Sequence, residues 1–310
     1  MKKQEDKSPS PKLVYRKGRG LLYQGKAEEF FSSSPARKYE GKVQLIFTSP
    51  PFPLNRKKKY GNLQQEQYIR WLTKFAPHFR KLLKKNGSIV IEMGNAWEPG
   101  KPLMSTLALR ALLRFQQAGR FNLCQQFIAH NPARLPGPAE WVNVRRIRVK
   151  DSYTHLWWLS PSMQPKASNR RILVPYSDSM KGLLTTREYN AGKRPSEHHI
   201  GETSFFKNNG GAIPSNVLVF SNTSNGDNYH NYCRQKKLQL HPARMPIGVV
   251  EFFIKFLTTP GDLVLDPFAG SNTTGAAAHQ LKRRWLSVEA REDYVAGSLG
   301  RFSEKKTKKG

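Results

Sequence analysis

The segment "LVLDPFAGSNTTG", residues 263–275, carries the clearest indication of a fold class in this chain. Its first four residues predict a buried strand that ends at Asp266. Gly270, Ser271 and Asn272 follow as a small-residue turn before a helix, so that the backbone can approach a ligand at the helix amino terminus. A Gly-x-Gly-x-x-Gly signature and a phosphate loop are both absent from the sequence. These absences argue against nicotinamide and triphosphate ligands and favour another cofactor that contains a nucleoside.

An acidic residue follows this turn at an informative spacing. The segment "RWLSVEA", residues 284–290, predicts the next strand, which ends at Glu289 about twenty residues after the turn. A carboxylate at this strand end is placed to accept hydrogen bonds from ribose hydroxyls.

A second strand ends in an unusual way, in "QLIFTSPPF", residues 44–52. Pro50 and Pro51 cannot continue a ladder, and they leave the carbonyls of Ser49 and Pro50 as stiff acceptors beside the Ser49 hydroxyl. Such a clamp suits the two N–H bonds of a nucleobase amine, and Phe52 offers a face for stacking. Taken alone, the motif is more typical of a plain strand-to-turn exit.

Strand and helix patterns alternate around both motifs. Strands are predicted at 13–15, 20–25, 43–48 and 87–94, with amphipathic helices at 66–83, 103–119 and 291–302. We therefore expect an α/β fold with a mostly parallel sheet and helices on both faces. Between the halves the helical periodicity fades and turn residues accumulate, which predicts an inserted, loop-rich region. The predicted division is 1–12 (basic tail), 13–131 (first half of the core), 132–240 (insertion), 241–302 (second half of the core) and 303–310 (basic tail).

The charge of the chain indicates its partner. Fifty-two Lys and Arg against 22 Asp and Glu give +30, and 38% of the residues are hydrophobic, enough for a packed core. Such a charge favours a polyanion, above all nucleic acid. No apolar segment approaches the ~20 residues of a spanning helix, and the amino terminus lacks an apolar signal core, so we expect an intracellular soluble protein.

Two basic segments are candidates for binding phosphate. One follows the Ser-Pro-Pro loop directly and contains Arg56, Lys57, Lys58 and Lys59. The other, "VNVRRIRVKD", places Arg146, Arg148 and Lys150 on one face of a predicted strand, next to Arg145. A solvated surface is the alternative interpretation for each segment.

Metal and disulfide chemistry are not indicated. Cys124 and Cys233 lie far apart, and the adjacent His198 and His199 occupy a polar, loop-like stretch.

The motifs together resemble a known family. "TSPPF", "DPFAGSNTTG" and "SVEA", in this order, resemble the amino-methylating DNA methyltransferases that use S-adenosylmethionine, in the β arrangement, where the catalytic motif comes first and the cofactor motif last. The likeness to the PvuII-type N4-cytosine modification enzymes runs nearly from Leu22 to Phe302. It includes "RKKKYGNLQQEQY", "EWVNVRRIRVKD", "PYSDSMK", "RPSEHHIG", "NNGGAIPSN" and "HPARMP".

The resemblance implies a Rossmann-like S-adenosylmethionine-dependent methyltransferase sheet in permuted order, in which 132–240 is the target-recognition region. Its implied cofactor is S-adenosylmethionine without a metal, its implied partner is double-stranded DNA, and a restriction endonuclease is the implied companion enzyme. The place of action would be the cytoplasm or nucleoid of a bacterium, or the nucleus of a eukaryote.

Site residues follow from the resemblance position by position. The implied catalytic loop is Ser49, Pro50, Pro51 and Phe52, where Ser49 and the first proline carbonyl hold the target amine. The implied cofactor-binding residues are Lys26, Thr48, His241, Pro242, Ala243, Asp266, Phe268, Gly270, Ser271, Asn272, Thr273 and Glu289. His241, Pro242 and Ala243 precede the helix "GVVEFFIKFL", which the family uses to wall the methionine end of the cofactor.

Three positions depart from the family pattern. Lys26 follows Gly25 where relatives commonly carry an Asp near the cofactor adenine. Residues 128–130, Ile-Ala-His, replace an aromatic cluster. Glu92 replaces a strand-end Asp; it is expected to orient Ser49 or to take a proton through water, and contact with the cofactor or capping of a turn are alternatives.

The expected reaction moves a methyl group to the exocyclic N4 amine of a flipped cytosine in duplex DNA, with CAGCTG or a related sequence as the suggested site. Adenine N6 methylation is the nearest alternative because the same clamp serves either amine; Ser49, in place of the Asp or Asn usual in adenine enzymes, favours cytosine. A non-catalytic basic DNA-binding protein is the second alternative, which Lys26 favours. Methylation at cytosine carbon-5 is disfavoured because neither cysteine lies in a Pro-Cys pair.

Overall fold

The computed structural model describes residues 10–52, 65–189, 192–193, 195, 199–201, 203, 205–220 and 227–303. The chain forms two compact units: Ser168–Ser215, and the rest of the described chain. The predicted phosphate-binding residues Arg56, Lys57, Lys58 and Lys59 lie outside the described residues, as do His198 and most of both predicted tails.

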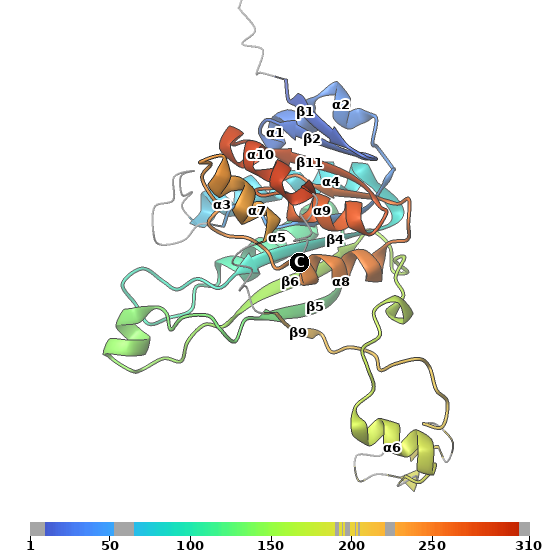
Figure 1. Ribbon diagram of the computed structural model, residues 1–310. Helices are drawn as coiled ribbons and strands as arrows, with labels where there is room; N and C mark the ends of the chain where they lie inside the picture. The colour runs from blue at the N-terminus through green and yellow to red at the C-terminus, as the bar shows by residue number, and fades with distance from the viewer. Residues whose placement is uncertain are drawn as a thin grey trace, which may run out of the picture. The chain divides into compact units, whose positions relative to one another are not determined.

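A mixed sheet forms the centre of the larger unit (Figure 1). In the described chain its strand order is β1-β2-β11-β10-β3-β4-β6-β5-β9. The run from β2 to β4 is parallel, while β1 and β6 join antiparallel to their neighbours. The bounds are β1 Lys12–Lys17, β2 Gly20–Gln24, β3 Val43–Thr48, β4 Leu83–Gly94, β5 Asn122–His130, β6 Tyr153–Ser160, β9 Val217–Val219, β10 Leu263–Asp266 and β11 Arg284–Glu289. This arrangement confirms the predicted α/β class.

Helices cover both faces of the sheet (Figure 1). Their bounds are α1 Ala27–Ser32, α2 Ser34–Arg37, α3 Gln65–Thr73, α4 Phe75–Leu82, α5 Leu107–Gly119, α7 Asn228–Gln235, α8 Ile247–Leu257, α9 Thr273–Gln280 and α10 Glu292–Ser298, with a 3₁₀ turn η3 at Leu299–Phe302. The single helix predicted at 66–83 is divided into α3 and α4. Pro77 explains the division, because it has no N–H to donate to the carbonyl of Thr73 and its ring clashes with that carbonyl.

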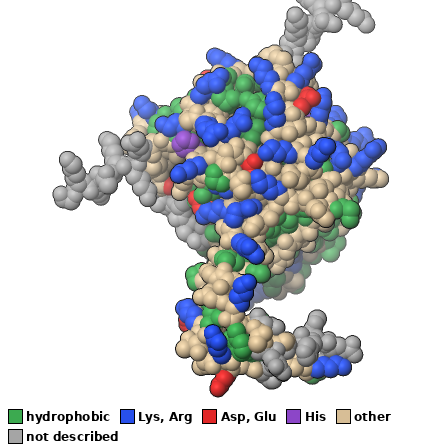
Figure 2. All heavy atoms as spheres, turned by 90° about the vertical axis from the view of Figure 1, so that its right-hand side faces the viewer, with side chains coloured by type: hydrophobic (Ala, Val, Ile, Leu, Met, Phe, Trp, Pro, Cys, Tyr) green, Lys and Arg blue, Asp and Glu red, His purple; other side chains and the backbone are tan. Residues whose placement is uncertain are grey.

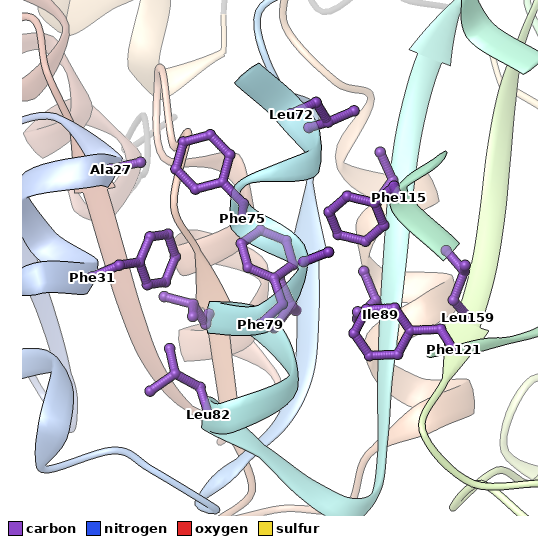
Figure 3. Close-up of a cluster of buried hydrophobic side chains, with 14 of the residues drawn as sticks. Ala27, Phe31, Leu72, Phe75, Phe79, Leu82, Ile89, Phe115, Phe121 and Leu159 are labelled. Atoms are coloured by element: carbon purple, nitrogen blue, oxygen red, sulfur yellow. The ribbon is translucent and has the colours of Figure 1, made fainter. Parts of the chain in front are cut away.

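The core on one face is rich in aromatic side chains. Figure 3 shows side chains from α1, α3, α4, α5, β4 and β6 pointing toward one another. Phe75, Phe79 and Leu82 recur at helical spacing on the buried side of α4. Phe79 is fully buried, with its ring centroid 5.6 Å from that of Phe115. Truncating such a ring costs about 3–5 kcal/mol, so this layer holds α4 and α5 firmly on the sheet.

Helix α8 covers the opposite face. Its apolar stripe includes Val250, Phe253 and Leu257, all fully buried. The ring centroid of Phe253 lies 5.8 Å from that of Phe47 on β3 and 4.9 Å from that of Phe127 on β5. The strands that carry the candidate site are therefore packed on both faces. No helix in the described segments combines the length and apolar character needed to cross a bilayer.

The strand predicted around Arg146, Arg148 and Lys150 is wrong. Residues Glu140–Val144 form a π-helical turn, η1, and the chain after it is irregular. The N–H groups of Ile147 and Arg148 both donate to the carbonyl oxygen of Trp141, at 2.9 and 3.2 Å. A left-handed φ of 53° at Arg146 interrupts any extended path. The backbone donors are thus used inside a compact loop and not in a ladder.

The smaller unit, Ser168–Ser215, contains little regular structure. It includes the 3₁₀ turn η2 (Asn169–Arg171), α6 (Asp178–Thr186) and the short strands β7 (Gly192–Lys193) and β8 (His199–Ile200). Val174 and Ala212 exchange two backbone hydrogen bonds, at 3.0 and 2.9 Å, and the Ser177 hydroxyl caps α6 by accepting from the N–H of Met180. These bonds order a unit in which turns dominate.

Candidate active site

The two sequence motifs meet at the carboxyl edge of the sheet. β10 lies between β11 and β3, so the ends of these parallel strands are neighbours. Asp266 accepts hydrogen bonds from the hydroxyls of Thr48 (2.8 Å) and Thr274 (2.6 Å) and from the N–H of Phe268 (3.1 Å). Burial raises the pKa of Asp266 to about 6, although these three donors lower it. Asp266 therefore joins the Ser-Pro-Pro loop to the turn at Gly270, Ser271 and Asn272 from within the protein.

The turn itself is fixed by Asn272, which is fully buried in the left-handed conformation (φ 57°). Its Oδ1 accepts from the N–H of Gly275 (3.2 Å) and the hydroxyl of Ser287 (2.7 Å), and its Nδ2 donates to the Tyr15 hydroxyl (3.1 Å). Asn272 thus caps α9 and ties the turn to β1 and β11.

Gly270 brings the turn close to the predicted His-Pro-Ala segment. Its φ is +52°, and a Cβ at this position would lie 2.8 Å from Nε2 of His241. The half-buried His241 ring lies edge-on to Tyr294, with centroids 4.5 Å apart, while Pro242 and Ala243 are exposed. The structure therefore places His241 beside Gly270, in the segment that leads into α8.

Glu289 closes the other side of the turn. Its Oε2 accepts from the N–H of Gly270 (2.7 Å) and its Oε1 from the N–H of Arg291 (2.9 Å). Its carbonyl oxygen accepts from the N–H of Gly25 (3.0 Å). Burial raises the pKa of Glu289, although the two backbone donors lower it. A carboxylate has about four acceptor sites, more than these backbone donors occupy, so Glu289 can also accept from a ligand.

Lys26 follows Gly25, whose N–H binds the Glu289 carbonyl, and it caps the start of α1. Its side chain is exposed, and its N–H donates to the carboxylate of Glu29 at 3.0 Å. An ammonium group cannot accept a hydrogen bond, so Lys26 cannot replace the acceptor function of an Asp.

Ser49 and Glu92 form a pair at the ends of β3 and β4. The exposed Ser49 hydroxyl donates to Oε2 of Glu92 at 2.5 Å. This bond uses the proton of the hydroxyl, so the remaining lone pairs of Ser49 are acceptors only. Within this loop Pro50 is buried and Pro51 is exposed. The arrangement can accept the N–H bonds of an amine.

A run of aromatic rings connects the loop after β3 with the loop after β10. Two of these rings were not predicted from the sequence as part of the site. The distances between ring centroids are 5.5 Å for Phe52 and Tyr68, 5.7 Å for Tyr68 and Trp71, and 5.4 Å for Trp71 and Phe268. Trp71 Nε1 also donates to Glu28 at 2.6 Å. The sequence predicts Tyr68 and Trp71 only as part of the amphipathic helix at 66–83. Their spacing of three residues, close after the Ser-Pro-Pro loop, is the feature that could have indicated two rings facing that loop.

Arg301 supports the turn from behind, and no sequence motif indicated it. Its Nη2 donates to the Ser271 hydroxyl (3.0 Å), its Nε to the Ser271 carbonyl (3.3 Å) and its Nη1 to Asp227 (3.1 Å). Burial lowers the pKa of Arg301. The hydroxyl of Thr273 lies 3.3 Å from that of Ser271, so this predicted residue belongs to the same network.

Arg145, Arg148 and Lys150 in the 145–150 loop each contact a different group within the protein. Arg145 pairs with Glu140 (2.8 Å) and lies over Trp141, and Arg148 contacts Asp151 (3.4 Å). Lys150 donates to backbone carbonyls at 132 and 134. The loop does not present its cations on one common face. Among the described residues no three metal-ligating side chains gather at one place.

Comparison with known proteins connects this site to a family. Residues 43–299 match the N6_N4_Mtase family, described as DNA methylase. The chain is 43% identical over 293 residues to the type II methyltransferase M.PvuII of Proteus hauseri, covering 94% of this chain and 86% of that protein. It is 24% identical over 270 residues to the DNA adenine methyltransferase YhdJ of Escherichia coli K12, covering 84% of this chain and 76% of that protein.

Solved structures agree with the sequence relatives. The structure of the PvuII DNA methyltransferase, described as cytosine-N4-specific, superposes with a TM-score of 0.76 at 37% identity and covers 95% of this chain and 90% of its own. On the evidence of the family match and of this similarity in sequence and fold, the chain belongs to the N6_N4_Mtase family of DNA methylases.

Proposed function

We propose that this chain transfers a methyl group from S-adenosylmethionine to the N4 amine of cytosine in duplex DNA. The observation that carries the proposal is the Thr48–Asp266 hydrogen bond, which holds the Ser49 loop at the same sheet edge as Gly270 and Glu289. The relative that is 43% identical has a structure described as cytosine-N4-specific, which supports the same reaction here.

The residues around the turn suit a nucleoside cofactor. Glu289 has carboxylate lone pairs for ribose hydroxyls, and it ends β11 directly beside Gly270 and Gly25. His241 and the amino-terminal end of α8 would border the methionine portion. When bound, S-adenosylmethionine supplies a methyl group that the positive sulfonium has already made electrophilic. The tasks left to the protein are alignment and handling of a proton.

The Ser49 loop performs the alignment in this proposal. The Ser49 hydroxyl, oriented by Glu92, and the carbonyl of Pro50 accept the two N–H bonds of the target amine. Accepting both bonds favours a pyramidal nitrogen, whose lone pair is then less delocalised into the ring. Phe52 contributes an apolar face beside the base, and the Ser49–Glu92 pair is the nearest route for the proton that the amine loses.

The target base must leave the duplex to reach this loop. Unstacking costs a few kcal/mol, which contacts between cationic side chains and phosphates offset. We assign such contacts to Arg56–Lys59 and to the 145–150 loop, within a target-recognition region at 132–240. In that loop Ile147 and Val149 are 60% and 86% exposed, as apolar side chains that meet base edges would be.

A companion enzyme and a recognition sequence belong to the same proposal. We infer a restriction endonuclease of matching specificity, because relatives such as M.PvuII and M.BglII are named type II methyltransferases. CAGCTG or a related sequence is the site that the resemblance to PvuII-type enzymes suggests. The chain would act where DNA is stored, in the nucleoid of a bacterium or the nucleus of a eukaryote.

Adenine N6 methylation is the second candidate. The similarity to the adenine methyltransferase YhdJ favours it, and the acceptors of the Ser49 loop fit either amine. Ser49 itself favours cytosine, because adenine enzymes usually carry Asp or Asn at this position.

A single assay tests both candidates. Labelled S-adenosylmethionine is incubated with the protein and duplexes that contain CAGCTG or random sequence, and the modified nucleoside is identified by mass spectrometry. We expect N4-methylcytosine, and a Ser49→Ala variant slower by about a hundredfold. N6-methyladenine alone would overturn the base assignment. A Ser49→Ala variant at full rate would overturn the mechanism, and absence of cofactor binding by calorimetry would leave a non-catalytic DNA-binding protein.

A further inference from the structure

Cationic side chains cover the edge of the sheet opposite to the candidate active site. The parallel strands β2, β11, β10, β3 and β4 begin at this edge, and basic residues crowd the turns that enter them. We name the group the rear basic edge; its described members are Arg16, Lys17, Arg19, Lys38, Lys42, Lys84, Lys85, Lys282 and Arg284. Figure 2, which views the side of the molecule where these strands begin, shows many Lys and Arg side chains and few Asp and Glu.

Backbone hydrogen bonds join these turns into one surface. The N–H of Gly41 donates to the carbonyl of Lys81, and the N–H of Gly261 donates to the carbonyl of Lys282, both at 3.0 Å. The side chain of Gln44 donates to the carbonyl of Asn86 at 3.2 Å. The turns that carry these cations are therefore held next to one another at the ends of packed strands.

The carboxylates described at this edge are already engaged. Asp262 is buried and pairs with Lys84 (3.0 Å) and Lys166 (2.6 Å). Glu40 pairs with Lys81 at 3.0 Å. Most of the rear basic edge is left without an opposite charge among the described residues, and such an excess attracts a polyanion.

The rear basic edge is too remote to assist the candidate active site. Lys42 precedes β3 and Ser49 follows it, so they are separated by about 23 Å at ~3.3 Å per residue. The Debye length at physiological ionic strength is about 8 Å, and charges almost three such lengths away are screened. A short, straight duplex seated across the carboxyl edge would not reach this surface, so an anion bound here would be a separate one.

We propose that the rear basic edge binds the phosphate backbone of a second segment of duplex DNA. The proposal goes beyond the proposed function, on which it relies only in naming DNA as the polyanion. Lysines on turns make contacts to phosphate without reading bases, so this binding is independent of sequence. A chain that holds two segments can pass from one to the other without entering free solution, which shortens the search for a target site.

Two charge-reversal variants test the proposal. Lys42→Glu/Lys85→Glu removes cations from the rear basic edge. Lys74→Glu/Arg114→Glu, here called the helix variant, makes the same change in net charge at the α3–α4 junction and on α5. All four side chains are exposed. Protein is saturated onto an immobilised duplex that contains its methylation site, and capture of a second, labelled duplex without that site is measured at several salt concentrations.

We expect the wild type to capture the second duplex, the rear variant to capture it about tenfold more weakly, and the helix variant to match the wild type. The slope of log affinity against log salt should fall by about two in the rear variant alone. Single-turnover methylation of a short duplex should be equal in all three. Failure of the wild type to capture a second duplex, equal losses in both variants, or preference of this surface for anionic phospholipid vesicles would each overturn the proposal. Capture without any methylation would instead overturn the proposed function alone.

Discussion

The hydroxyl of Thr48 donates to the carboxylate of Asp266 across the boundary between β3 and β10, although 218 positions separate them in the chain. Each residue ends its strand, and each is followed by a loop that the site requires. The bond lies in the buried layer below the site. The position of the Ser49 loop relative to the Gly270 turn therefore depends on a buried hydrogen bond within the protein.

Removal of this hydroxyl tests that dependence. We expect Thr48→Val to lower the free energy of unfolding by about 1–3 kcal/mol, because the buried Oδ1 of Asp266 loses a donor. Thr48→Ser, which keeps the hydroxyl, should lose less than half as much. Urea denaturation measures both variants, and equal stabilities would contradict the role of the hydroxyl.

The raised pKa of Asp266 predicts how stability depends on pH. The native carboxyl has a pKa of about 6, above its ordinary value, so between about pH 4 and pH 6 the native state binds more protons than the unfolded state. The contribution of Asp266 to the free energy of unfolding is therefore present at low pH. As the pH rises through about 6, up to about 3 kcal/mol of it is lost.

Urea titrations of the wild type and Asp266→Asn at several pH values measure this contribution. The difference in unfolding free energy, wild type minus variant, should fall as the pH increases from about 4 to about 7. A difference that is constant or rises with pH would show that Asp266 is already ionised in the acidic native protein.

Arg301 predicts an effect on cofactor binding. Its guanidinium holds both the hydroxyl and the carbonyl of Ser271, so Arg301→Gln should loosen the turn and weaken binding of S-adenosylmethionine about tenfold by calorimetry. The rate at saturating cofactor should change less. Arg283→Gln is the matched control, because Arg283 is another buried arginine bound to carbonyl oxygens, at the far edge of the sheet. Equal losses of affinity in both variants would indicate general destabilisation.

Glu92 should affect the methylation rate and not cofactor affinity. Glu92→Ala removes the acceptor that orients Ser49, and we expect kcat to fall about a hundredfold with the Kd for S-adenosylmethionine unchanged. Glu92→Gln keeps an oxygen acceptor and should fall between the wild type and Glu92→Ala. Weaker cofactor binding at an unchanged kcat would instead assign Glu92 to the cofactor.

Features set by local pattern were predictable from the sequence. The apolar runs ending at Thr48 and Asp266 are short and bounded by loop residues, so strand type and strand end could both be inferred. Because parallel strands end at one edge, the proximity of Ser49, Asp266 and Glu289 followed from their positions. The family resemblance added the expectation that the catalytic motif precedes the cofactor motif, as in the β arrangement.

Features set by distant contacts were not predictable. Arg301 reaches Ser271 only because η3 folds back on the turn, and no local pattern reports that contact. The alternation of Arg146, Arg148 and Lys150 predicted a strand, yet the carbonyl of Trp141 captured the N–H groups that a ladder needs. Periodicity describes which side chains could share a face, whereas hydrogen-bond partners decide whether the strand exists.

If the Ser49 loop binds the target base as proposed, the direction of the Ser49–Glu92 hydrogen bond also determines which bases the loop excludes. With its proton committed to Glu92, the Ser49 oxygen offers only lone pairs, and the Pro50 carbonyl never offers anything else. A keto base such as thymine or uracil would bring its own oxygen against these acceptors, and repulsion would replace two hydrogen bonds. In the proposed mechanism the loop would therefore discriminate amino from keto bases before any methyl group moves.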